Sequence, residues 1–164
     1  MKVRANRQSG FSLIELVIVV VIIGIIAAIA IPRLSRGSAG AADSAVSGNL
    51  AVLRSAIDLF ATEHGGSYPS VGTFDPQLTQ YTDSSGSFSA TKTGNFVYGP
   101  YLRKVPPLPV GPAGYKGVNT IVDGSSGTPG TTAGGWFYNA NTGDIKANLA
   151  DTVTDSSGKI YNTY

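Results

Sequence analysis

Glu15 is a carboxylate in an unusual position. The 21 residues from Phe11 to Ile31 carry no other charge. At about 1.5 Å per residue, a helix of that length spans roughly the hydrocarbon core of a bilayer. An ionisable side chain inside that core costs several kcal/mol, so it needs a partner. The run therefore predicts a membrane-crossing helix in which Glu15 has a functional role.

The chain offers few other groups for chemistry. It has no cysteine and one histidine, His64, which excludes disulfides, thiolate metal sites and a cysteine nucleophile. It also lacks the GxSxG elbow, the P-loop and the glycine fingerprint of dinucleotide-binding proteins. His64 precedes Gly65 and Gly66, a pattern typical of a helix C-terminus with a left-handed glycine cap. We therefore expect a helix end at His64, and no enzyme.

The charges of the chain do not favour a nucleic-acid partner. The formal net charge is +2, but three of the 12 basic residues, Lys2, Arg4 and Arg7, lie in the first ten positions. The other nine face ten acidic residues and are scattered, apart from the pair Arg103-Lys104. A phosphate backbone needs a continuous basic surface. We expect no nucleic acid among the partners.

Three ordinary explanations of the apolar run fit less well. A plain signal anchor would account for the run and the basic residues before it, but not for Glu15. A secretory signal peptide cut after Ala39-Gly40-Ala41 would need an apolar region about twice the usual length. A soluble core helix would need a polar face, which residues 16–31 lack. The basic residues favour a cytoplasmic Met1–Gly10, by three to two over those that follow the run.

The start of the chain combines three features: Gly10-Phe11-Ser12-Leu13-Ile14-Glu15-Leu16, the apolar run and Pro32-Arg33-Leu34. This combination resembles the class III leader of type IV pilins and type II secretion pseudopilins. It implies that a prepilin peptidase cuts between Gly10 and Phe11 and that the new amino group of Phe11 is N-methylated. It also implies that Glu15 is the assembly residue, paired with the Phe11 amine of a neighbouring subunit. Gly10 suits a cleavage site because glycine adopts backbone angles closed to other residues.

Gly24 and Pro32 interrupt the predicted membrane helix. Glycine weakens a helix by about 1 kcal/mol relative to alanine, and proline removes a backbone donor and crowds the carbonyl of Ala28. We expect bending or loosening between them, and the resemblance implies such loosening when a pilin moves from bilayer to filament. Gly24 and Ala28, four residues apart, could also let two helices approach closely. Both interpretations stay open.

After Pro32 the predicted helix becomes amphipathic. Large apolar residues recur at steps of three and four on one face: Val46, Leu50, Leu53, Ile57 and Phe60. Arg54 and Asp58, at the edge of that face, are expected to form a weak surface pair. Residues 36–40 are predicted to dilute helicity and act as a flexible neck. This half of the helix should therefore lie on a domain.

The rest of the chain is predicted to form a loop-rich β head. Five short segments are strand candidates: 96–98, 120–122, 136–138, 145–149 and 159–161. Residues 139–143 should turn the third of these into the fourth as a hairpin. The polar stretches 82–95 and 123–135 indicate surface loops, and the prolines of 106–112 indicate an extended connector.

The predicted fold class is α+β and pilin-like, with a long N-terminal helix packed on a small antiparallel sheet with long loops. The expected domains are a cleaved leader at 1–10, a transmembrane and assembly helix at 11–32, an amphipathic half at 33–64 and a head at 65–164.

The head shows a further pattern in the order of the helix, the Tyr68-Pro69 loop, the connector YLRKVPPLPVGP and the hairpin GWFYNANTGDIKAN. This order resembles, more loosely, the G-type major pseudopilin of type II secretion. That family often binds calcium near the C-terminus. Within 144–158, oxygen ligands are available at Asp144, Asp151, Asp155 and Ser157. Their spacing fits no EF-hand loop, so calcium and solvated loop acids both stay open. No other cofactor is expected.

The sequence thus predicts a structural subunit of a type IV pilus-like filament, most specifically the major pseudopilin of type II secretion. The resemblance implies a homo-oligomeric filament, a prepilin peptidase and methylase, an inner-membrane assembly platform and minor pseudopilins as partners. It places a single-pass subunit in a bacterial inner membrane with its head in the periplasm, and later in a periplasmic or extracellular filament. A surface pilin for adhesion, motility or DNA uptake, and a monomeric membrane-anchored binding module, are the alternatives.

Overall fold

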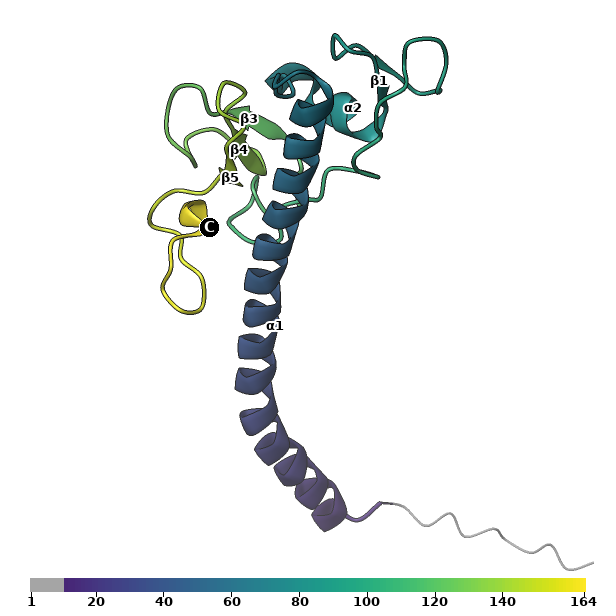
Figure 1. The fold of residues 1–164 in the computed structure, drawn as a ribbon. Helices are drawn as coiled ribbons and strands as arrows, with labels where there is room; N and C mark the ends of the chain where they lie inside the picture. Colours follow the sequence, from purple (N-terminus) through teal and green to yellow (C-terminus); the bar gives the residue numbers. More distant parts are fainter. Residues whose placement is uncertain (1–10) are drawn as a thin grey trace, which may run out of the picture. The chain divides into compact units, whose positions relative to one another are not determined.

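The computed structural model describes residues 11–164, except for the side chains at positions 35 and 36. The chain divides into two compact units, Met1–Ser38 and Ala39–Tyr164, here called the helix unit and the head. One helix, α1 (Leu13–Glu63), continues from the first unit into the second (Figure 1).

The predicted loss of helicity after the membrane segment is wrong. Residues 36–40 are helical, and Pro32 lies inside α1. Helix formation is cooperative, so a nucleated helix can pass through isolated glycines, each of which costs about 1 kcal/mol. Flexibility of residues 36–40 remains a prediction.

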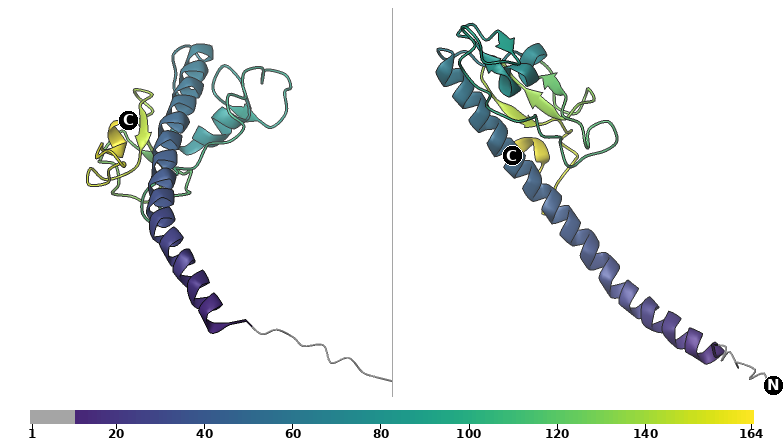
Figure 2. Two further views of the ribbon diagram at one scale, coloured as in Figure 1. Left: turned by 90° about the horizontal axis from the view of Figure 1, so that it is seen from below. Right: turned by 90° about the vertical axis from the view of Figure 1, so that its right-hand side faces the viewer.

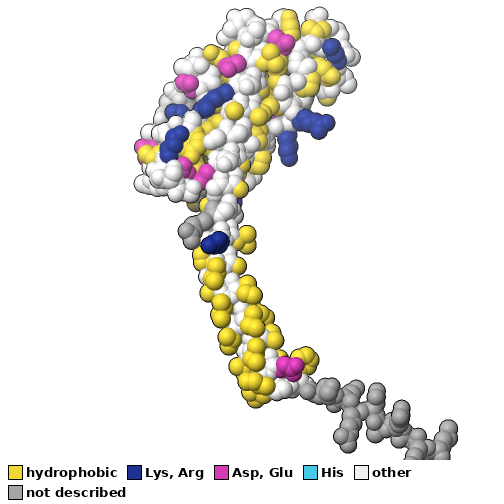
Figure 3. All heavy atoms as spheres, turned by 60° about the horizontal axis from the view of Figure 1, so that its bottom comes forward, with side chains coloured by type: hydrophobic (Ala, Val, Ile, Leu, Met, Phe, Trp, Pro, Cys, Tyr) yellow, Lys and Arg dark blue, Asp and Glu magenta, His cyan; other side chains and the backbone are white. Residues whose placement is uncertain are grey.

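The helix unit presents apolar side chains on all sides. Large residues from Phe11 to Leu34 are exposed around its whole circumference, and Figure 3 shows them in yellow along the helix. An 18-residue window of this helix has a mean hydropathy of 3.2. By length and composition, α1 is the one helix among the described residues that could cross a membrane.

The head joins the second half of α1 to a series of short elements. In chain order these are η1 (Val71–Thr73), α2 (Phe74–Thr79), β1 (Tyr81–Thr82), β2 (Phe88–Ser89), β3 (Ile121–Asp123), β4 (Trp136–Tyr138), β5 (Ile145–Ala147) and η2 (Tyr161–Thr163). The proline connector lies outside helices and strands, as predicted, because proline cannot donate to a strand ladder. Figure 2 shows the three-stranded sheet beside α1 in the head.

The strands form two small sheets. β1 pairs with β2 antiparallel, and the larger sheet has the order β3-β4-β5. The predicted hairpin is confirmed: β4 and β5 are antiparallel, with Trp136 opposite Ala147 and Tyr138 opposite Ile145. β3 instead runs parallel to β4, so the larger sheet is mixed. The long connection from β3 to β4, residues 124–135, returns the chain to the same end of the sheet.

Two predicted strands are absent. In 96–98 only Tyr98 forms a bridge, to Thr82, since left-handed glycines at 94 and 99 confine the extended backbone to a few residues. In 159–161 only Ile160 forms a bridge, to Thr154, and the chain then enters η2.

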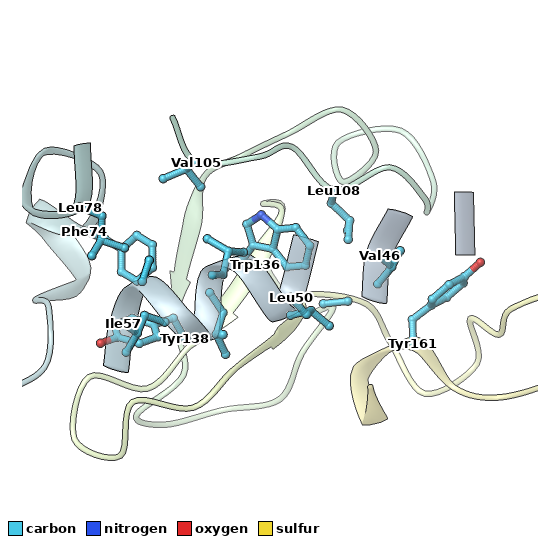
Figure 4. Packing of buried hydrophobic residues seen from close by; sticks show 14 of the residues in the cluster. Val46, Leu50, Ile57, Phe74, Leu78, Val105, Leu108, Trp136, Tyr138 and Tyr161 are labelled. Atoms are coloured by element: carbon cyan, nitrogen blue, oxygen red, sulfur yellow. The ribbon is translucent and has the colours of Figure 1, made fainter. Parts of the chain in front are cut away.

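The predicted apolar face of α1 is the base of the core. Its five large residues are each 0–1% exposed, and they pack with Phe74, Leu78, Leu108, Trp136 and Tyr138 (Figure 4). The Trp136 ring reaches this cluster while its Nε1–H donates to the carbonyl oxygen of Pro106 at 2.7 Å. This partly buried bond ties the hairpin to the proline connector.

Candidate processing and assembly site

Glu15 lies in the first turn of α1, where its carboxylate turns back to the chain. Its Oε2 accepts a hydrogen bond from the backbone N–H of Ser12 at 3.3 Å. The carbonyl oxygen of Ser12 accepts from the N–H groups of Glu15 and Leu16 at 3.1 and 3.3 Å. A carboxylate at this helix end also offsets the helix dipole.

This arrangement is one half of a capping box. In that motif a Ser or Thr before the helix and a Glu three residues later satisfy backbone donors that the helix leaves unpaired. The Ser12-x-x-Glu15 spacing is visible in the sequence and could have predicted the contact. Glu15 thus has a local structural role besides any role in assembly.

The surroundings of Glu15 supply no positive charge within the described part of the chain. Its side-chain hydrogen bond is to the Ser12 amide, and the side chains along the following turns are exposed and apolar. Phe11, the predicted new N-terminus, is 79% exposed. Gly10, the predicted residue before the cleaved bond, lies outside the described residues. The structure therefore brings Phe11 and Glu15 to the same helix end.

Gly24 and Pro32 are both within continuous helix. A Cβ atom built on Gly24 meets no other atom within 4 Å, so nothing in a single chain requires glycine there. Its role must be sought in helix flexibility or in contact with another helix. Both roles remain predictions.

α1 ends at Glu63, and His64 directly follows it, close to the predicted helix end. Its Nδ1 lies 2.7 Å from the carbonyl oxygen of Phe60, which can only accept, so Nδ1 carries the hydrogen. The imidazole also stacks on the Phe60 ring at 3.8 Å and is 7% exposed. Gly65 and Gly66 follow with φ of 65° and 90°, the left-handed backbone expected of a helix cap.

The acids considered for calcium do not converge. Asp151 accepts from Asn162 Nδ2 at 2.6 Å, and Asp144 accepts from Thr142 Oγ1 at 2.9 Å. Asp155 is occupied by its own turn, accepting from the backbone N–H groups of Ser157 and Lys159 at 2.7 and 2.8 Å. Among the described residues, no three Asp, Glu, His or Cys side chains are grouped to hold a metal.

The C-terminal segment, residues 151–164, is held on α1 by hydrogen bonds that Asp43 accepts. Asp43 Oδ2 accepts from the backbone N–H and the hydroxyl of Ser156, at 3.1 and 2.6 Å, and its Oδ1 accepts from the Tyr161 hydroxyl. Sequence reasoning missed this contact, because a carboxylate and a tyrosine so far apart give no local signal.

Arg54 does not form the predicted pair with Asp58. Its Nη2 instead donates to the carbonyl oxygens of Ile145 and Tyr164, at 3.2 and 2.5 Å. Two backbone acceptors that face α1 satisfy the guanidinium better than one exposed carboxylate, whose attraction water screens. Arg54 therefore fastens both β5 and the end of the described chain to the helix.

Comparison with known proteins identifies one family model, the prokaryotic N-terminal methylation motif, which matches residues 5–31. Comparisons with curated proteins and with solved structures give no match. The matched residues contain the predicted cleavage site, Glu15 and Gly24. The motif indicates a type IV pilin-like or pseudopilin subunit, and it implies processing by a prepilin peptidase and assembly into a filament. The apolar helix and α+β head fit a membrane-anchored pilin of this kind.

Proposed function

We propose that this chain is the major pseudopilin of a type II protein secretion system. It is made as a membrane-inserted precursor, cut between Gly10 and Phe11, N-methylated at Phe11 and then assembled into a filament. The N-terminal methylation motif supports the pilin-like class. The connector and β4–β5 hairpin support the pseudopilin branch through their resemblance, and the absence of cysteine supports it because many long-pilus subunits close a disulfide loop.

The position of Glu15 is the observation that carries the proposal. Within the described residues, its carboxylate meets one weak donor, the Ser12 amide at 3.3 Å. The helix that carries it exposes apolar side chains to every side. In a bilayer such a carboxylate gains most from a cation. The ammonium group of Phe11 in a neighbouring subunit supplies that charge after cleavage, and the pairing fixes the register between subunits.

The proposed pathway places the head in the periplasm and the uncut leader in the cytoplasm. The homo-oligomeric filament grows from an inner-membrane assembly platform and begins on minor pseudopilins. The growing filament pushes folded proteins out through an outer-membrane channel. The chain itself has no catalytic role in this scheme.

Mass spectrometry of the mature N-terminus tests the processing step. A mature chain that begins with methylated Phe11 is expected, whereas a start near Ala42 would contradict the filament model. For assembly, Glu15→Val should leave cleavage intact and abolish filaments seen by electron microscopy. Ile18→Val, a change in the next turn that leaves the charge in place, is the matched control and should keep filaments. Normal filaments from Glu15→Val would refute the role assigned to Glu15.

The secretion role is tested by deleting the gene in its host. Loss of protein secretion without loss of surface filaments is the expected result. Loss of surface filaments, adhesion, motility or DNA uptake with secretion intact would identify a surface pilin instead. A chain that stays monomeric in crosslinking and electron microscopy would identify a membrane-anchored binding module.

A further inference from the structure

Arg33 is the first charged residue after the apolar run of α1. The sequence holds no acid between Glu15 and Asp43, so no carboxylate of the same helix lies within a turn of its guanidinium. Within the part of the chain that the structure describes, Arg33 is exposed and makes no hydrogen bond or ion pair. A guanidinium group carries five N–H donors in a fixed fork. An anion for Arg33 must therefore come from outside the helix unit.

Arg33 also borders a hollow on the surface of the helix. The hollow has a volume of about 500 Å³ and is lined by Ala30, Ile31, Arg33 and Leu34. Ala30, Arg33 and Leu34 lie on one face, because residues three and four apart are neighbours on a helix. A helical side chain leans toward the preceding turn, so the stem of Arg33 lies on the side of the short Ala30. A cation beside apolar space suits an anion that has an apolar part.

The distance from the start of α1 to Arg33 matches the thickness of a bilayer core. α1 begins at Leu13, 20 positions before Arg33, which is about 30 Å along the axis at 1.5 Å per residue. The hydrocarbon core of a bilayer is also about 30 Å thick. When Leu13 lies at one edge of that core, Arg33 lies at the other, and the large apolar side chains between them are exposed. The anions at that level of a bilayer are the phosphate groups of phospholipids.

We propose that Arg33 binds the phosphate of a phospholipid in the periplasmic leaflet, while an acyl chain of the same lipid fills the hollow beside Ala30. The guanidinium fork donates two parallel N–H···O bonds to a phosphate, which the point charge of a lysine does not match. This inference rests on the proposed function, for which it names a partner of the membrane-held subunit. The occupant is a lipid because Arg33 ends an apolar helix of bilayer length, which lipid surrounds before the subunit assembles.

A lipid bound at Arg33 fixes the depth of the helix in the membrane. A guanidinium resists entry into hydrocarbon, and the phosphate holds it at the level of the headgroups. The other end of the helix then emerges at the cytoplasmic surface, which places the bond between Gly10 and Phe11 among the headgroups instead of in the core. A peptidase that uses water for hydrolysis can reach the bond there. The same lipid contact breaks when the helix is drawn out of the bilayer.

Native mass spectrometry of the full chain in detergent micelles tests the lipid contact, with dioleoylphosphatidylglycerol as the added lipid. The unmodified chain should retain one lipid. Arg33→Gln should retain it at least several-fold less, and Arg33→Lys, which keeps the charge but not the fork, should fall between them. Arg103→Gln is the matched control, because Arg103 is also exposed and has no partner within the described residues. Equal retention by Arg33→Gln and Arg103→Gln would overturn the proposal.

Two further ligands separate the two halves of the proposed lipid site. Dioleoylglycerol has the same acyl chains without the phosphate and should not be retained. Equal retention of dioleoylglycerol would refute the contact between the guanidinium and the phosphate. Inorganic phosphate offers the anion without the chains, and at millimolar concentration it should not displace the phospholipid. Displacement would refute the part of the proposal that assigns an acyl chain to the hollow.

Spin labelling measures the depth of the helix, because the chain has no cysteine of its own. A nitroxide attached to Val19→Cys lies in the half of the membrane helix that is nearer the leader. In vesicles of phosphatidylcholine and phosphatidylglycerol, Arg33→Gln should move this label about 3 Å toward the leader side, the rise of two residues, since positions 33 and 34 can then enter the hydrocarbon. Arg103→Gln should leave the depth unchanged. An unchanged depth in Arg33→Gln would overturn the anchoring role.

Flotation of the same vesicles after alkaline extraction separates this inference from the proposed function. A chain that floats with the lipid, but whose lipid retention and depth do not depend on Arg33, refutes the lipid site alone. A chain that alkaline extraction removes is not inserted in the membrane, and that result refutes the proposed function itself.

Discussion

The carboxylate of Asp43, in the first turns of α1 within the head, accepts the hydroxyl hydrogen of Tyr161, 118 positions further along the chain. The same carboxylate accepts two hydrogen bonds from Ser156. Tyr161 is 6% exposed and belongs to the core. One side chain of the helix therefore positions the C-terminal segment, residues 151–164.

Asp43→Asn should lower the free energy of unfolding of the full chain in detergent micelles at pH 7. Asparagine keeps the size of the side chain but loses the charge that strengthens three hydrogen bonds. The expected loss is about 1 kcal/mol, because the carboxylate is partly exposed and water screens its interactions. Thermal unfolding measures it, with Asp58→Asn, an exposed acid without side-chain partners in the described chain, as the control. An equal loss in both variants would contradict the role of Asp43.

The effect of Asp43→Asn should shrink in acid. Hydrogen bonds from Ser156 and Tyr161 hold the pKa of Asp43 below its ordinary value. A carboxyl group with a lowered folded-state pKa contributes its full stability above the unfolded-state value, about 3.9. That contribution is lost as the pH falls through the folded-state value. The difference in free energy of unfolding between the two proteins should therefore stay constant from pH 7 to 5 and decline below about pH 4.

Two adjacent residues of α1 should differ strongly in how much their truncation destabilises the head. Leu53 is 0% exposed, whereas Val52 points outward. Leu53→Ala should reduce the free energy of unfolding by about 3 kcal/mol, since it removes buried methyl groups and leaves a cavity. Val52→Ala should change it by less than about 0.5 kcal/mol. Chemical denaturation of both variants checks the face assignment, and a large loss from Val52→Ala would contradict it.

Gly130→Ala should destabilise the head by more than about 2 kcal/mol. Gly130 has φ of 80°, and a Cβ atom there would lie 2.3 Å from the backbone nitrogen of Ala150, which cannot move without displacing the chain after β5. Gly117 has nearly the same φ, 79°, but open space around it. Gly117→Ala should therefore cost only the backbone strain, about 1 to 2 kcal/mol. Equal melting temperatures for the two variants would show that the close approach is absent.

Calcium should not change the thermal stability of the chain. The acids of 144–158 are used in separate hydrogen bonds, and Asp155 accepts from Tyr164 and from its own turn. The Tyr164 hydroxyl bond is the main cause that holds the pKa of Asp155 well below its ordinary value. We expect the same melting temperature in a chelator and in millimolar calcium. A rise of several degrees with calcium, absent in Asp155→Asn, would establish a site.

Gly24→Ala should slow backbone amide exchange in the membrane helix. Alanine favours a helix by about 1 kcal/mol over glycine, and at Gly24 an added Cβ meets no atom of the same chain. Hydrogen exchange in micelles should slow several-fold around residue 24 and stay unchanged in the head. Unchanged exchange around residue 24 would count against the predicted loosening. Lost filaments with slowed exchange would leave the close approach of two helices as the alternative to test.

The sequence predicted those parts of the fold that local patterns determine. The apolar face from Val46 to Phe60 became the base of the core because residues spaced three and four apart on a helix lie on the same side of it. The β4–β5 hairpin was also predicted from a local pattern, the turn residues 139–143 between two short apolar segments. β3 was found near its predicted place, but its parallel pairing with β4 depends on the path of the intervening loop, which carries no periodic signal.

The contacts that close the head could not be predicted in the same way. Arg54 was assigned to Asp58 by spacing, yet it binds backbone carbonyls more than 90 positions away. Such acceptors exist in every residue, so the sequence does not mark the ones that are used. At the N-terminus, the cost of a carboxylate in a bilayer predicts a functional role for Glu15. The local contact with Ser12 was missed, although the Ser12-x-x-Glu15 spacing is visible in the sequence.

The hydrogen bond between Ser12 and Glu15 has a consequence for how a filament would lose subunits. Because Glu15 Oε2 already accepts from the Ser12 amide of its own chain, a neighbour's ammonium would add a second donor to a carboxylate that has further acceptor sites. The free energy gained at this site would then be smaller than for a carboxylate with no donor at all. A subunit that left the filament would keep the Ser12 donor, so its carboxylate would not be left without a partner in the bilayer.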